Sequence, residues 1–191
     1  MIIPIAHGGA RDISNVQWVT NRVNRGKIDL TTDEYLNAIK SIFLYKKNNY
    51  EITSLNYIDS SFKELDNTSI NCTYNKSCKL MAEIDHFCTS HYFQKKAGRL
   101  EGKHPNGKEL EELFKSQGGI CPFYGVKMIL GGGEKRDLAT IDHTIPVSSG
   151  GTDEIKNLKW VTSEANSIKQ NMSDSEFMDH NILVLTRFKL I

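Results

Sequence analysis

The sequence predicts an α+β fold that contains two unequal copies of one small unit, joined by a helical and loop-rich middle region. Three observations support this prediction. Within residues 138–169, apolar and polar residues alternate as in a strand, a loop-like stretch follows, the alternation returns, and the last part has helical spacing. Residues 3–35 repeat residues 145–177 without a gap. The chain between them carries apolar residues at helical spacing. We therefore expect three regions, at 1–48, 49–117 and 118–191.

The N-terminal region contains the first copy of the repeat and one helix. The two copies are identical at twelve of thirty-three aligned positions, including an Asn-x2-Trp-Val-Thr stretch. Thr31 and Glu34 have the spacing of a capping box, which opens a helix. Apolar residues at helical spacing extend that helix to about residue 48.

The middle region has weaker signals. Residues 49–74 are polar and rich in Ser and Asn, whereas residues 79–100 have patterns that allow helical segments. Residues 108–117 predict a clearer amphipathic helix, which ends at Gly118 and Gly119.

The C-terminal region predicts strand, loop, strand and helix in that order. Residues 138–143 alternate like a strand, and residues 146–156 are rich in Ser, Gly and Asp, as loops are. Residues 157–161 predict a second strand. Thr162 or Ser163 can cap a short helix that runs to about residue 169. Ser173 and Glu176 form a second capping box, which opens a further helix.

Four polar residues of this region have the chemistry of phosphodiester hydrolysis. They are Asp142, His143, Asn157 and Asn166, in the pattern His-x13-Asn-x8-Asn. A histidine titrates near pH 7 and can activate water, while Asp and Asn oxygens suit a hard cation. With Gly150, Gly151 and Trp160 at their positions, this stretch resembles the core of an HNH endonuclease.

The resemblance implies a ββα-metal fold and a role for each residue. His143 corresponds to the general base, Asp142 and Asn166 to the ligands of Mg²⁺ or Mn²⁺, and Asn157 to the residue that braces the loop and orients the base. Adjacent residues of a regular strand point to opposite faces. Asp142 and His143 can therefore share one site only if the strand ends or distorts there.

The first copy resembles only the second half of this motif. Asn15 and Asn24 match Asn157 and Asn166, but Met1 falls on the position of His143. Three interpretations remain: a degenerate copy kept for fold or DNA contact, a remnant, or a half-site that another molecule completes. Arg22, Arg25 and Lys27 are its candidate DNA contacts. We expect its apolar side chains to pack inside the fold; they are Val16, Trp18, Val19 and Val23.

A structural zinc site is a further expectation. Many HNH domains begin with Cys-x2-Cys, but here Tyr124 stands where the second cysteine after Cys121 would be. Three other cysteines and a histidine have the ligand types of a tetrahedral zinc; they are Cys72, Cys78, Cys88 and His91. Free thiols, and a disulfide in an oxidising compartment, are the alternatives.

Charge limits how the chain can bind nucleic acid. The net charge is only +1, so DNA binding has to depend on local basic patches. Lys95, Lys96 and Arg99 belong to the most basic segment, whose alternative is an ordinary solvated helix and loop. Lys169, three residues after Asn166, is a further candidate contact.

The sequence thus predicts a DNA endonuclease, with a non-catalytic DNA-binding protein of the same fold as the alternative. A toxin or an RNA nuclease would also fit the motif, but no secretion signal supports either. We find no run long enough to span a membrane and no signal-peptide pattern, so we expect an intracellular, cytoplasmic protein. Its high Asn, Lys and Ile content is compatible with a phage or mobile element. No residue pattern indicates an oligomeric state.

Overall fold

The computed structural model describes residues 2–48, 88–100, 105–131 and 136–191. A two-stranded antiparallel sheet lies near its centre, formed by β1 (Ala139–His143) and β2 (Leu158–Thr162). Helix α5 (Ser163–Lys169) follows at once, because the Thr162 side chain accepts a hydrogen bond from the Ala165 amide and caps it. The predicted order of strand, loop, strand and helix is confirmed, and so is the α+β class.

Two helices cover one face of this sheet, namely α3 (Thr89–Ala97) and α4 (Gly107–Ser116). Their aromatic rings meet Trp160 edge to face: the ring centroids of Phe93 and Phe114 lie 5.6 and 5.7 Å from it. The Trp160 indole N–H donates to the Leu110 carbonyl at 2.9 Å. Trp160 is completely buried, and this cluster is therefore a large part of the core.

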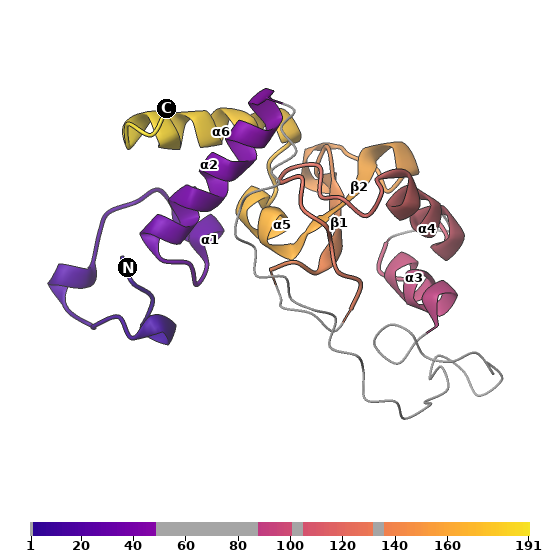
Figure 1. The fold of residues 1–191 in the computed structure, drawn as a ribbon, viewed down its shortest axis with the longest axis horizontal. Coiled ribbons are helices and arrows are strands. Elements are labelled where there is room, and N and C mark those ends of the chain that lie inside the picture. Colours follow the sequence, from indigo (N-terminus) through magenta and orange to yellow (C-terminus); the bar gives the residue numbers. More distant parts are fainter. Residues whose placement is uncertain (1, 49–87, 101–104, 132–135) are drawn as a thin grey trace.

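The remaining helices are α1 (Asn21–Lys27), α2 (Thr32–Asn48) and α6 (Asp174–Arg187). Both predicted capping boxes are present: Glu34 and Glu176 each accept a hydrogen bond from the amide of their cap residue, at 2.7 Å. Helix α1 packs against α5, and α2 packs against α6 (Figure 1). Each helix of the N-terminal copy therefore contacts its own counterpart in the C-terminal copy.

The repeat is present in the structure as well as in the sequence. The helices and 3-10 turns of the first copy begin 142 positions before their counterparts in the second. The 3-10 turns η1 (Ile5–His7) and η2 (Ile13–Asn15) correspond to η3 (Val147–Ser149) and η4 (Ile155–Asn157). The glycine after the first turn of each copy takes a left-handed conformation, with φ of 80° in one and 87° in the other. The sequence identity of the two copies therefore reflects the same backbone path.

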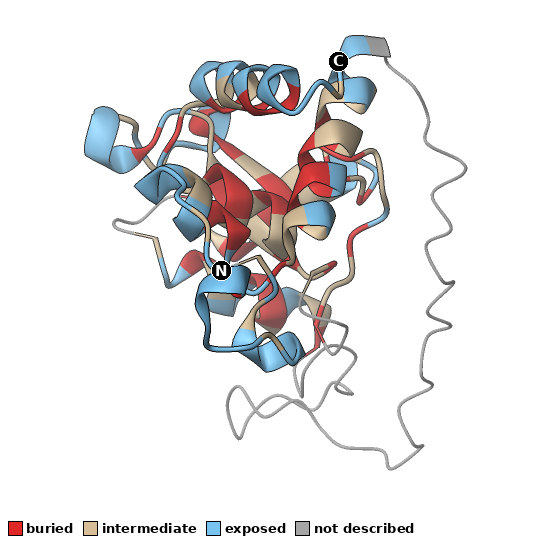
Figure 2. Cartoon of the chain, turned by 90° about the vertical axis from the view of Figure 1, so that its left-hand side faces the viewer, coloured by how far each residue is buried: buried red, intermediate tan, exposed pale blue. Residues whose placement is uncertain are grey.

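The two copies differ at the second strand. Residues 16–20 occupy the positions of β2 and have extended backbone at both ends, Val16 and Thr20, but they pair with no strand among the residues described. Trp18 is fully exposed, at 101% of its reference area, whereas its counterpart Trp160 is at 0%. Our expectation of packing is therefore wrong for Trp18 and for Val16 and Val19, which are also exposed, while Val23 does pack against the core. Figure 2 shows how little of this N-terminal segment is buried.

Within the part of the chain that the structure describes, every helix is too short or too polar to cross a membrane.

Candidate active site

The loop between β1 and β2 is held by one side chain. The Asn157 amide donates to the carbonyls of Ile145 and Thr152, at 2.9 and 2.8 Å, and its oxygen accepts from the Ile145 amide at 2.9 Å. These are the bracing contacts expected of Asn157. Gly151 allows the loop to close, because a Cβ there would lie 1.8 Å from the Ile145 carbonyl oxygen. The ends of the loop are thus fixed next to the last residue of β1.

His143 is that last residue of β1. Its Nε2 lies 2.7 Å from Asp153 Oδ1, and both side chains are mostly buried, at 23% and 15% exposure. The sequence did not indicate Asp153, because a carboxylate ten residues away in a loop has no periodic relation to the strand. The contact nevertheless places a hydrogen-bond acceptor directly on the candidate base.

Asp142, one residue earlier, is almost completely buried between two lysines. Its Oδ1 lies 3.0 Å from Lys169 Nζ, and its Oδ2 lies 3.1 Å from Lys159 Nζ. Lys159 also approaches Asp174 Oδ1, at 2.6 Å. Two carboxylates and two ammonium groups therefore neutralise each other in a network that ties both strands to α5 and to the start of α6.

A pocket of about 320 Å³ opens at the end of β1. Asp142, His143 and Asn166 all line it, so the end of the strand allows the two adjacent residues to reach one site. Asn157 lies outside this lining and acts on the loop instead. Ten residues line the pocket in all: Ile141, Asp142, His143, Pro146, Val147, Ser148, Asn166, Lys169, Gln170 and Asn171.

Two oxygen-bearing side chains of the pocket, Asp142 and Asn166, are of the type that a hard divalent cation binds. Asp142 Oδ2 is buried and accepts no hydrogen bond from the described residues. Lys159 Nζ is its charged neighbour, but Lys159 has Asp174 as a second and closer partner. A carboxylate oxygen from Asp142 and a carboxamide oxygen from Asn166 would be the protein's ligands for Mg²⁺ or Mn²⁺, with Lys159 remaining on Asp174.

Two of the candidate DNA contacts are wrong. Lys169 is completely buried and donates to the His143 carbonyl at 2.7 Å as well as to Asp142. Lys27, at the equivalent position of the first copy, is 5% exposed and donates to the Ile2 carbonyl at 2.7 Å. Both lysines hold backbone where we expected phosphate contacts, because an ammonium group can be buried once carbonyl and carboxylate oxygens surround it.

The other candidate contacts are more accessible. Arg22 and Arg25 are exposed on α1, as is Lys95 on α3 and Arg99 just after it. Lys96 is half-buried, with its ammonium 5.2 Å from the centre of the Tyr92 ring. These side chains lie on elements other than those that form the pocket.

The expected zinc ligands are only partly within the described residues. Cys72 and Cys78 lie outside them. Cys88 is buried, and its Sγ lies 3.3 Å from Nδ1 of His91, one helical turn later. Two of the four expected ligands are therefore adjacent.

The first copy has other residues at the positions of His143 and Asp153. Met1, at the position of His143, lies outside the described residues, and Arg11 occupies the position of Asp153. The Asn15 side chain nevertheless repeats the brace, with hydrogen bonds to Ile3 and Ala10 of 2.8 to 2.9 Å. Asn24, at the position of Asn166, is exposed.

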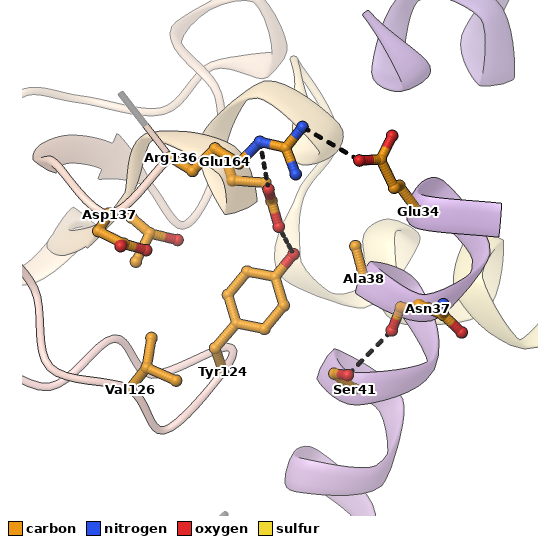
Figure 3. Close-up of a pocket in the computed structure, with 10 residues that line it drawn as sticks. Glu34, Asn37, Ala38, Ser41, Tyr124, Val126, Arg136, Asp137 and Glu164 are labelled. Carbon is orange, nitrogen blue, oxygen red and sulfur yellow. Dashed lines mark hydrogen bonds and ion pairs between the residues drawn. The ribbon is translucent and has the colours of Figure 1, made fainter. Parts of the chain in front are cut away.

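A second pocket, of about 230 Å³, lies between α2 and the core and contains none of the predicted site residues (Figure 3). Arg136 bridges Glu34 and Glu164 there, at 3.7 and 3.6 Å, and the Tyr124 hydroxyl donates to Glu164 at 2.8 Å. Burial raises the pKa of Glu164, although Tyr124 and Arg136 oppose the shift. The two ion pairs of Arg136 link α2 to α5, and so they connect the two copies.

Comparisons of the chain with protein-family models, with curated proteins and with solved structures found no match.

Proposed function

We propose that the protein is a metal-dependent endonuclease of the HNH type, which hydrolyses phosphodiester bonds in DNA inside the cell. The observation that supports this proposal is that Asp142, His143 and Asn166 line one pocket, beside a loop that Asn157 braces. An imidazole next to a carboxylate and a carboxamide is the minimum set for activating water and holding a hard cation.

Each residue has a separate task in this proposal. His143 takes the proton of the attacking water, since a neutral imidazole is a suitable base near pH 7. Asp142 and Asn166 would hold Mg²⁺ or Mn²⁺, which would neutralise charge on the phosphate and the leaving oxygen. No three His, Cys, Asp or Glu side chains gather as a metal site in the described ranges, so water and phosphate would supply the other ligands.

The test is cleavage of supercoiled plasmid DNA in the presence of Mg²⁺, read as nicked, linear or fragmented product. His143→Ala should reduce the rate by about 10²- to 10⁴-fold, the usual contribution of general acid–base catalysis. Its fold and DNA affinity should remain, because the base is needed only in the chemical step.

His7→Ala is the matched control, since His7 lies in the first copy, far along the chain from the pocket residues, and should leave the rate unchanged. Cleavage at the normal rate by pure His143→Ala protein would refute the proposed site.

One observation favours the alternative of a non-catalytic DNA-binding protein. Each oxygen of Asp142 lies within 3.1 Å of a lysine ammonium group, so the two lysines offset the charge of this carboxylate without a metal ion. This alternative predicts DNA binding that Mg²⁺ does not affect and no product at any metal concentration. Metal-dependent nicking that His143→Ala abolishes would exclude it.

We also propose a structural zinc held by Cys72, Cys78, Cys88 and His91. The 3.3 Å contact between Cys88 and His91 supports it, since both are ligand types for zinc. Elemental analysis of the purified protein should then find about one equivalent of zinc. Less than roughly a tenth of an equivalent after gentle purification would contradict the proposal.

A further inference from the structure

Asp153 is the closest polar partner of the candidate base. Its Oδ1 lies 2.7 Å from His143 Nε2, and neither side chain is more than a quarter exposed. A carboxylate can only accept hydrogen bonds, so the proton of the neutral imidazole lies on Nε2. Nδ1 then carries the lone pair.

The loop brace sets this contact. The side-chain amide of Asn157 donates to the backbone carbonyl of Thr152, the residue directly before Asp153. The backbone carbonyl of Asn157 accepts from the backbone amide of Thr144, the residue directly after His143. Both bonds are 2.8 Å long. One asparagine therefore holds the backbone next to both partners of the His143–Asp153 pair.

The first copy serves as an internal control for what Asp153 does. Its loop has the same brace from Asn15 and the same left-handed glycine, yet Arg11 occupies the position of Asp153. The loop conformation therefore does not need a carboxylate at this position. The carboxylate is present in the copy that has the histidine and is replaced in the copy that has Met1 instead.

We propose that Asp153 is a positioning residue for catalysis: it fixes the tautomer and orientation of His143, so that Nδ1 is the atom that takes the proton from water. In the reaction, water loses a proton to Nδ1 while its oxygen attacks phosphorus, and the leaving oxygen departs with the electrons of the broken P–O bond. The imidazole is then doubly protonated, and the Asp153 carboxylate stabilises its charge. This inference rests on the proposed nuclease function.

The first experiment measures the tautomer without DNA or metal. Nitrogen NMR of ¹⁵N-labelled protein at a pH where imidazole is neutral distinguishes protonated from unprotonated ring nitrogens. We expect a single form with Nε2 protonated in the wild type, and a mixture of both tautomers in Asp153→Ala. Glu154→Gln is the matched control, because Glu154 is exposed and pairs with Lys156, and it should give the wild-type spectrum.

The second experiment measures cleavage by the same proteins. Asp153→Asn can present its amide N–H to Nε2 and so favour the wrong tautomer; we expect kcat to fall by about 10²- to 10⁴-fold with KM within a few-fold. Asp153→Glu retains a carboxylate and should recover part of the rate. If Asp153→Ala does not fold, these two variants carry the test.

Two results would overturn the inference. One is an unchanged ring spectrum in both Asp153→Ala and Asp153→Asn, whatever happens to the rate, because Asp153 would then act only on the loop. The other is a changed spectrum with a normal kcat. If the wild type shows the expected tautomer but never cuts DNA, the pairing is correct and the proposed nuclease function fails.

Discussion

The two copies of the repeat share a backbone and differ in what surrounds it. Both keep the asparagine brace, the left-handed glycine, the threonine cap and a buried lysine at the end of the short helix. Among the described residues, the second strand is paired and the tryptophan covered only in the C-terminal copy, where Asp142 also lies 3.0 Å from the buried lysine. The local fold of this unit therefore depends on caps and side-chain brace bonds, whereas burial and charge chemistry depend on β1 and the helices that cover it.

The tryptophans should show the largest difference between the copies. Trp160→Ala removes a completely buried ring and should cost about 3–5 kcal/mol of stability. Trp18→Ala removes an exposed ring and should change the free energy of unfolding by about 0.5 kcal/mol or less. Urea unfolding followed by circular dichroism measures both. Equal losses would show that Trp18 is covered in solution.

The buried lysines should differ next. Lys169→Met leaves the buried Asp142 carboxylate with Lys159 as its remaining ammonium partner and should cost on the order of 3 kcal/mol, because removing one partner of a buried ion pair leaves the other charge less well compensated. Lys27→Met loses a hydrogen bond to one carbonyl, which should cost about 1–3 kcal/mol. The comparison requires thermal or urea unfolding of both variants. A larger loss for Lys27 would show that Asp142 contributes little to this network.

The two copies should also differ in how much the asparagine of their short helix, Asn166 or Asn24, contributes to cleavage. Asn166→Ala should lower cleavage by at least about 10-fold at limiting Mg²⁺, since losing even a residue that supports a metal ligand typically costs that much, and added Mg²⁺ or Mn²⁺ should restore part of the rate. Asn24→Ala should leave the rate within a few-fold of wild type, since the aligned histidine position is Met1. Loss of cutting in a stable Asn24→Ala protein would mean that another chain completes a second site there.

The smallest expected effect concerns DNA contact by the first copy. Arg22 and Arg25 are exposed on α1, and neutralising both should weaken DNA binding and reduce the salt dependence of the binding constant by about 0.9 in log–log slope for each lost phosphate contact. Lys27→Gln is the control, because its buried ammonium is unable to reach a phosphate. Unchanged slopes would leave the first copy as scaffold or remnant.

Much of the local structure could be predicted because its causes lie close together in sequence. Thr162 and Ser173 are caps whose partners are three residues away, and the brace by Asn157 follows from the repeated pattern around it. Side-chain partners across the fold could not be predicted. The pairing of Asp153 with His143 depends on how the loop folds back, and the burial of Lys169 depends on carboxylates from two other elements.

Trp18 also shows that contacts across the fold could not be predicted from the sequence. The repeat places Trp18 on the position of Trp160, but it does not say whether a partner strand and covering helices exist there. The sequence therefore predicts which backbone conformation forms more reliably than it predicts what covers it.

The contrast between Trp18 and Trp160 also gives the protein a built-in optical probe. The chain has two tryptophans, one fully exposed and one fully buried, so its fluorescence should contain a red-shifted component that acrylamide quenches readily and a blue-shifted one that it does not. Replacing either ring with phenylalanine isolates the other signal. One such protein would report what approaches the first copy, and the other would report the opening of the core around β2.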